Sequence, residues 1–113
     1  MLEIERLLSP EDPPSVGILN QHSDSPYLFI CDHGNNAIPI ALAKLGLDDE
    51  NLRKHIAYDL GALQVATLLA KRFSAPLIWQ NYSRLVVDCN RQLDHPQLIP
   101  LLSDHIMIPG NKG

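Results

Sequence analysis

The amino-acid sequence predicts an α/β fold with a mostly parallel or mixed sheet. Three observations support this fold class: an apolar run at residues 27–31, an amphipathic segment at residues 51–73 and a second apolar run at residues 77–80. A strand, a long helix and a strand in this order are typical of a βαβ crossover, because a tight hairpin cannot join parallel strands. The length of 113 residues suits one small domain.

Composition and charge exclude several classes of protein. Hydrophobic residues make up 45% of the chain and charged residues 19%, which is typical of a globular core. The formal net charge is −4 and the basic residues are scattered, so no nucleic-acid-binding face is expected. No apolar run approaches the roughly 20 residues that cross a bilayer, and residues 1–5 carry no signal-peptide pattern. We therefore expect a cytoplasmic protein whose Cys31 and Cys89 are reduced and buried.

Residues 1–26 are predicted to form an irregular leader that packs over the domain. The segment has no sustained hydrophobic period, and its prolines are Pro10, Pro13, Pro14 and Pro26. The folded domain is expected to span residues 27–113.

Local signals predict the first strand and the segments after it. Residues 27–31 are apolar without alternation, as expected for a strand that is covered on both faces. The Gly-Asn-Asn sequence at residues 34–36 favours a turn. A proline then opens a short helical segment at residues 40–45, and Gly46 ends it.

Residues 51–73 are predicted to form one long amphipathic helix, with Asp48 or Asp49 as its N-cap. Apolar residues recur along one face at spacings of three and four: Leu52, Ile56, Leu60, Leu63, Ala66 and Ala70. Asp59 lies in the middle of this apolar face, and His55 lies at its border one turn earlier.

Two apolar runs follow the predicted helix. Residues 74–76 break the helix with a proline, and residues 77–80 are predicted to form the second strand. Residues 85–87 form a third apolar run, predicted as a strand, which ends in the polar residues 88–91.

Two titratable side chains are candidates for chemistry. His33 directly follows the first strand, where it is either a metal ligand or general base, or a histidine hydrogen-bonded in a loop. Asp59 faces the predicted core, where an ionised carboxylate must be paired, hydrogen-bonded or bound to a cation. Its partner is then a metal ion or an arginine such as Arg84 or Arg91. The spacing of His55 and Asp59 also allows the carboxylate to orient the imidazole.

Polar residues also end the third apolar run. Asp88 and Asn90 share one face of an extended strand, and Arg91 is suited to bind a carboxylate through two parallel hydrogen bonds. Alternatively, Asp88 and Arg91 satisfy each other. Because the carboxyl ends of parallel strands meet at one edge of a sheet, His33 and Asp59 are expected to converge with this cluster. The sequence therefore predicts a site for an anionic small molecule, with or without a divalent metal.

In order and spacing, four segments resemble the N-formylglutamate amidohydrolase family over about residues 29–111. The segments are Cys31-Asp32-His33 with Asn36-Ala37-Ile38-Pro39, His55 to Ala62, Tyr82 to Arg91, and Ile108-Pro109-Gly110-Asn111. The resemblance implies a three-layer α/β fold related to the zinc carboxypeptidases. It also implies hydrolysis of the N-formyl amide of N-formyl-L-glutamate, or of a related N-acyl amino acid, to formate and glutamate in histidine degradation.

The resemblance further implies roles for individual residues. His33 is the implied first ligand of a divalent metal, zinc, and Asp59 is the implied acidic ligand. Asn90 and Arg91 match the pair that binds a substrate carboxylate, and Arg84 is a further candidate beside them. The implied reaction is attack of a zinc-bound water on the formyl carbonyl, which the metal polarises.

The chain departs from the family in residues 34–36 and in length. Gly34-Asn35 stands in place of an expected Ala-Ser pair. Asn36 stands where the carboxypeptidase pattern has a glutamate ligand, and Asp59 is taken as the acidic ligand instead. Family members continue past residues 108–111, where the third metal ligand and the catalytic acid/base are expected. Residues 27–113 are therefore expected to be the N-terminal part of an amidohydrolase domain that alone binds metal weakly and turns over nothing. The alternatives are an inactive domain that binds a carboxylate or a partner chain, and a homo-oligomer formed through exposed sheet edges.

Overall fold

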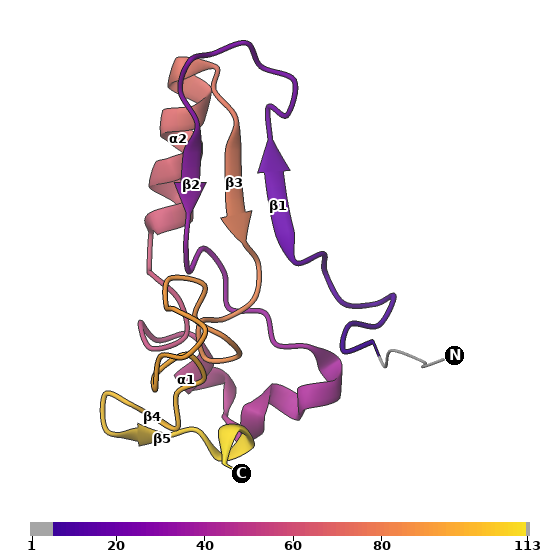
Figure 1. The fold of residues 1–113 in the computed structure, drawn as a ribbon, viewed down its shortest axis with the longest axis vertical. Helices are drawn as coiled ribbons and strands as arrows, with labels where there is room; N and C mark the ends of the chain where they lie inside the picture. Colours follow the sequence, from indigo (N-terminus) through magenta and orange to yellow (C-terminus); the bar gives the residue numbers. More distant parts are fainter. Residues whose placement is uncertain (1–5, 113) are drawn as a thin grey trace.

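The computed structural model describes residues 6–112, so residues 1–5 of the predicted leader and Gly113 lie outside the described residues. A three-stranded sheet contains β1 (Val16–Leu19), β2 (Phe29–Cys31) and β3 (Leu77–Gln80) (Figure 1). The strand order is β1-β3-β2; β2 runs parallel to β3, and β1 runs antiparallel to it. The predicted α/β class with a mixed sheet is thereby confirmed.

The helix α2 (Ala62–Phe73) connects β2 to β3 and packs on one face of the sheet (Figure 1). The small side chains of Ala66 and Ala70 face the strands, so the helix comes close enough to bury Cys31 and Leu77 beneath it. This confirms the predicted βαβ crossover. Of the three layers that the resemblance implies, residues 6–112 supply the sheet and the helix on this face. No helix among these residues is long and apolar enough to cross a membrane.

The predicted helix at residues 51–73 is wrong over its first half. The structure has instead a short helix, α1 (Asp49–Leu52), and an irregular stretch at residues 53–61. Asp48 caps α1 as predicted, because its side chain accepts a 2.9 Å hydrogen bond from the Asn51 N–H.

Two backbone features account for the interruption. Gly61 has a φ of 80°, a left-handed conformation that lies outside the helical region and that glycine adopts at little cost. The Asp59 N–H donates to the His33 carbonyl at 2.9 Å instead of to a carbonyl one helical turn earlier. Asp59 therefore lies in a loop, where its carboxylate is drawn to the end of β2 rather than to the apolar face of a helix.

The predicted strand at residues 85–87 is also wrong. The chain turns at this point, and the Val86 N–H donates to the Ser83 carbonyl at 3.0 Å. The buried Leu85 packs in a hydrophobic cluster and not in a sheet. Because the backbone forms no strand here, Asp88 and Asn90 do not lie on a shared strand face.

The leader and the segment after β2 also differ from the prediction. Residues 16–19 of the predicted irregular leader form β1, and Gly17 allows this pairing because a Cβ atom there would lie 2.0 Å from the ring of Trp79. The predicted helix at residues 40–45 holds only at its start. It lies in a 3₁₀ segment, η1 (Ile40–Gly46), in which Ala43, Lys44 and Leu45 have left-handed φ values of 48° to 56° that are not helical.

Residues 34–61 and 81–112 form the strand-end lobe, so named because β2 and β3 both run towards it (Figure 1). It contains η1, α1, a short hairpin of β4 (Leu102–Ser103) and β5 (Ile106–Met107), and η2 (Pro109–Asn111). Its core is a second hydrophobic cluster of buried residues: Leu45, Leu47, Leu52, Ile56, Ala57, Leu85 and Ile108. The strand-end lobe therefore has a core separate from that beneath α2.

Candidate active site

The candidate site lies where β2 meets the strand-end lobe. His33 follows β2 by two residues and has a left-handed φ of 56°, which turns the chain sharply out of the strand. Asp59 belongs to the loop before α2, and Asp88 follows the turn at residue 85. The site thus combines the end of a parallel strand, the usual place for chemistry in α/β folds, with side chains from irregular segments.

The imidazole of His33 lies between two carboxylates. Its Nδ1 is 3.3 Å from Oδ2 of Asp59, and its Nε2 is 2.6 Å from Oδ1 of Asp88. His33 is 5% exposed and Asp88 4%, so this shorter contact is shielded from water. Both ring nitrogens can donate together only in the protonated imidazolium; a neutral ring donates from one nitrogen and offers a lone pair at the other.

Arg84 closes a ring of charged groups around His33. Its Nη1 is 3.1 Å from Oδ1 of Asp59, and its Nη2 is 3.7 Å from Oδ2 of Asp88. Arg91 also approaches Asp88, with Nε at 3.6 Å from Oδ2, and the Asn90 N–H donates to Oδ1 of Asp88 at 3.0 Å. The salt bridge expected between Asp59 and Arg84 and that between Asp88 and Arg91 are therefore both present.

Backbone hydrogen bonds fix the spacing of these side chains. Besides the bond from Asp59 to the His33 carbonyl, the Arg84 N–H donates to the Ala57 carbonyl at 3.2 Å. The buried Ser83 hydroxyl donates to the same carbonyl at 2.7 Å. The loop that carries Asp59 is thus tied on one side to the end of β2 and on the other to the turn that carries Arg84.

The local environment changes the pKa of three groups near His33. Burial alone would raise the pKa of Asp88, but hydrogen bonds from His33 and the Asn90 N–H, with the charges of His33 and Arg84, hold it below the ordinary value. Burial and neighbouring carboxylates raise the pKa of the Cys31 and Cys89 thiols. Cys89 is exposed, contrary to the prediction, and both thiols are free. A raised thiol pKa disfavours a nucleophilic role for either cysteine.

A groove of about 750 Å³ leads to the site along β2. Its polar lining includes four predicted site residues: His33, Asp59, Arg84 and Asn90. Its apolar wall comes from β2 and from α2. Arg91 lies outside this groove and lines, with Arg84 and Asp88, a small cavity of about 70 Å³.

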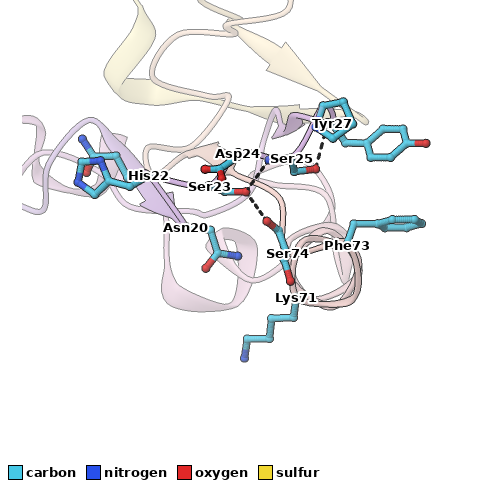
Figure 2. A pocket seen from close by; sticks show the side chains of 11 residues that line it. Asn20, His22, Ser23, Asp24, Ser25, Tyr27, Lys71, Phe73 and Ser74 are labelled. Carbon is cyan, nitrogen blue, oxygen red and sulfur yellow. Dashed lines mark hydrogen bonds between the residues drawn. The ribbon is translucent and has the colours of Figure 1, made fainter.

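A separate groove of about 870 Å³ lies near the amino ends of β2 and β3, among residues 20–27 and the end of α2 (Figure 2). Figure 2 shows Ser23 between Ser25 and Ser74: its hydroxyl donates to the Ser74 carbonyl and accepts from the Ser25 N–H at 3.1 Å. This groove contains no predicted site residue.

Hydrogen bonding is complete in the interior of the described chain. Every buried side-chain nitrogen or oxygen within residues 6–112 has a hydrogen-bond partner.

One important residue has a closer partner in addition to the one predicted. Asp88 was expected to pair with Arg91 or to lie with Asn90, whereas its shortest side-chain contact is with His33. The signal in the sequence was an acidic residue at the end of an apolar run, which predicts burial and hence a need for a strong hydrogen-bond donor. The predicted pairing of His55 with Asp59 is wrong, because His55 pairs with Asp104 at 3.3 Å on the surface.

The residues present include side chains of the types that bind zinc. No group of three or more His, Cys, Asp or Glu side chains among the described residues is arranged to hold a metal ion. However, a tetrahedral zinc binds each ligand at about 2.0 to 2.1 Å, so two of its ligand atoms lie about 3.3 Å from each other. The distance between Nδ1 of His33 and Oδ2 of Asp59 is also 3.3 Å. Imidazole and carboxylate are also donors that zinc prefers. His33 and Asp59 thus fit as two ligands of a metal that needs at least one more.

The fold is that of an α/β protein with a mixed sheet. Its site places a histidine and two carboxylates near the carboxyl end of a parallel strand, an arrangement that suits acid–base or metal chemistry. The family model of N-formylglutamate amidohydrolase matches residues 25–113, so the chain belongs to this family.

One solved structure extends the likeness to three dimensions. It is described as the crystal structure of gene product Atu2144 from Agrobacterium tumefaciens, with 39% sequence identity and a TM-score of 0.89. The match covers 93% of the present chain, which spans 42% of the length of that structure. No curated protein matches the chain.

Proposed function

We propose that the chain carries part of the active site of a metal-dependent amidohydrolase that cleaves N-formyl-L-glutamate, or a related N-acyl amino acid, to formate and the amino acid. Family membership supports the reaction class. The observation that carries the proposal is the placement of His33 between Asp59 and Asp88. The 3.3 Å between Nδ1 of His33 and Oδ2 of Asp59 equals the separation of two ligands bound to one zinc ion. The proposed place of the reaction is histidine degradation in the cytoplasm.

His33 and Asp59 would hold the metal, which we propose to be zinc. When bound, zinc would polarise the formyl carbonyl and activate a water molecule for attack. Asp88 would accept a hydrogen bond from the Nε2–H of His33, and this contact would leave the lone pair of Nδ1 available to the metal. Asp88 is thus proposed as the residue that fixes the tautomer and orientation of the ligand.

Asn90 and Arg91 are proposed to bind a substrate carboxylate. The Asn90 side chain lines the groove beside His33, and Arg91 is partly exposed with only a 3.6 Å contact to Asp88, so its other nitrogens remain available. Arg84 is a weaker candidate, because both terminal nitrogens already face carboxylates. Its proposed main role is to hold Asp59 and Asp88 on either side of His33.

The charge balance of the site supports a metal dication. Asp59 and Asp88 offset the positive charges of Arg84 and Arg91, so these four side chains together are neutral. N-formylglutamate carries two carboxylates, and a neutral, partly buried site gives little electrostatic attraction to such an anion. Adding a zinc ion would make the site positive, as an anionic substrate requires.

Zinc binding to the chain and to an Asp59→Asn variant tests the metal site. We expect weak binding of zinc to the chain by calorimetric titration, and at least about tenfold weaker binding for the variant. Asp104→Asn is a matched control, because Asp104 is a partly exposed carboxylate paired with a histidine outside the site. Equal zinc affinity for both variants, or no zinc bound to the original chain, would contradict the assignment.

Formate release from N-formyl-L-glutamate tests the reaction itself. Because His33 and Asp59 are only two of the three protein ligands that a catalytic zinc needs, we expect little or no formate release from the chain alone, and any release should require zinc, stop on chelation and fall with Asp59→Asn. Release that resists chelation would contradict a metal-dependent mechanism. Binding of N-formyl-L-glutamate that neither zinc nor Asp59→Asn changes would support the alternative of a carboxylate-binding module.

A further inference from the structure

One face of the sheet is apolar and uncovered. Ile18, Ile78 and Ile30 are register partners across β1, β3 and β2, so their side chains lie in one row on the face opposite α2. Val16 in β1 and Leu28, directly before β2, each lie two residues along the chain from a member of this row. All five side chains are exposed, Ile30 to 68%. We call this surface the isoleucine face: Val16, Ile18, Leu28, Ile30 and Ile78.

Parallel strands rarely have one apolar face exposed to solvent. A parallel pair such as β2 and β3 occurs almost only where both faces of the sheet are covered, because the crossover helices place apolar side chains on both. Here Leu77 and Cys31 on one face are buried beneath α2, whereas Ile78 and Ile30 on the other face are exposed. The isoleucine face therefore has the composition of an interior surface.

The free edge of β2 lies beside the same surface. β2 pairs with β3 on one side, and no strand pairs with its other side among residues 6–112. The groove that leads to His33 runs along β2 and is walled on the helix side by Val65 and Leu69. A strand added parallel to β2 would place its carboxyl end next to His33.

The molecule is less compact than a domain of its length, which agrees with an apolar sheet face that is not covered. The radius of gyration is 15.5 Å, compared with about 13 Å for a compact domain of this length. The matching crystal structure superposes over 93% of the present chain, and yet more than half of that other chain lies outside the match.

From these observations we infer that the isoleucine face and the edge of β2 bind a polypeptide equivalent to the unmatched part of the Agrobacterium structure. This polypeptide would add a strand beside β2 and cover the isoleucine face with an apolar helix. Its strand end would also complete the site at His33. The inference rests on family membership and on the sheet, and not on the proposed reaction or metal.

Co-expression tests the inference. The tagged chain would be produced together with the part of the Agrobacterium gene product outside the match, purified through the tag and sized by light scattering. We expect a complex of one copy of each polypeptide. Ile30→Lys should weaken it by at least about tenfold, because a lysine at the centre of a buried apolar interface costs that much.

The chain offers a matched control on another surface. Leu68 on the outer side of α2 is 69% exposed, almost the same as Ile30. Leu68→Lys should leave the complex intact. Leu28→Lys repeats the test outside the strand, in case Ile30→Lys does not fold.

Three outcomes would overturn the inference. The first is equal binding by the Ile30 and Leu68 variants. The second is absence of a complex between the two polypeptides. The third is a homodimer of the tagged chain that Ile30→Lys disrupts, since a second copy would then occupy the isoleucine face. The metal and formate measurements are separate, so failure of this inference is distinguishable from failure of the proposed function.

Discussion

The sheet layer, made of β1, β2, β3 and α2, and the strand-end lobe hold their cores together in different ways. In the sheet layer, strand ladders and a helix satisfy the backbone, and Ala66 and Ala70 bring α2 close to Leu77. In the strand-end lobe, short turns surround Leu85, and polar side chains satisfy the backbone. Asn111, for example, donates from Nδ2 to the carbonyls of Leu85 at 2.8 Å and Pro100 at 2.7 Å.

The candidate site lies at the boundary between these two regions. The sheet layer directs His33 outward at the end of β2, and the strand-end lobe brings Asp59 and Asp88 to the two sides of its ring. A strand end has a fixed direction but offers few side chains, whereas an irregular loop can place a carboxylate wherever its backbone is anchored. The regular region thus sets the position of the site, and the irregular region supplies most of its chemistry.

The strongest test of this division is whether the two cores unfold together. Leu77 in the sheet layer and Leu85 in the strand-end lobe are both fully buried, and truncation of either to alanine should lower the free energy of unfolding by about 3 kcal/mol. We expect each variant to shift one common transition in urea, followed by circular dichroism, because the backbone bond between Asp59 and His33 links the regions.

Leu68→Ala is the control for this pair. The side chain is largely exposed on α2, so the change should stay within about 0.5 kcal/mol. Two separate transitions, with Leu85→Ala moving only one of them, would show that the strand-end lobe unfolds by itself and would contradict a shared cooperative unit.

Asp88→Asn is expected to have an intermediate effect on the free energy of unfolding. The variant removes a buried charge that accepts hydrogen bonds from His33 and the Asn90 N–H, which should cost about 2 kcal/mol at neutral pH in metal-free buffer. The pKa of Asp88 is lowered from 3.8 in the folded chain. Its carboxylate therefore stabilises the fold fully above the unfolded pKa, and this contribution is lost as the pH falls through the folded pKa.

The difference in free energy of unfolding between Asp88→Asn and the original chain should accordingly shrink as the pH falls below 3.8, measured by urea denaturation at several pH values. Asp104→Asn, on the surface beside His55, should show no comparable effect at neutral pH. A destabilisation by Asp88→Asn that stays constant down to the lowest pH would mean that the charge of Asp88 is not what stabilises the folded chain.

The sequence predicts the sheet layer better than the strand-end lobe for a physical reason. Strands such as residues 77–80 and the second half of the predicted helix are specified by local hydrophobic patterns, which the tertiary structure reinforces. In the strand-end lobe, the apolar residues 85–87 have a strand-like pattern but lie in a turn that buries Leu85 and leaves Val87 exposed. The local sequence does not distinguish an apolar run that forms a strand from one that forms a turn, because contacts with distant segments of the chain determine which of the two forms.

The same distinction applies to the candidate site. The strand that ends before His33 and the need of Asp59 for a partner follow from the sequence, and the structure brings the two together. The contact between His33 and Asp88 does not follow, because it joins residues 55 positions apart through a turn that the strand prediction excluded. Its distance depends on backbone bonds made by Ser83 and Arg84, which no sequence pattern indicates.

The smallest effect concerns Gly61, where the strand-end lobe passes into α2. Its φ of 80° favours glycine, and a Cβ added at this position would have no atom within 4 Å, so Gly61→Ala should cost about 1 kcal/mol through backbone strain alone. Gly61→Asn should cost less, because asparagine tolerates this conformation better. If alanine instead stabilised the chain and raised its helical circular dichroism, residues 51–73 would prefer one continuous helix. The loop that holds Asp59 beside His33 would then depend on this glycine, and not on the hydrogen bonds that anchor it at both ends.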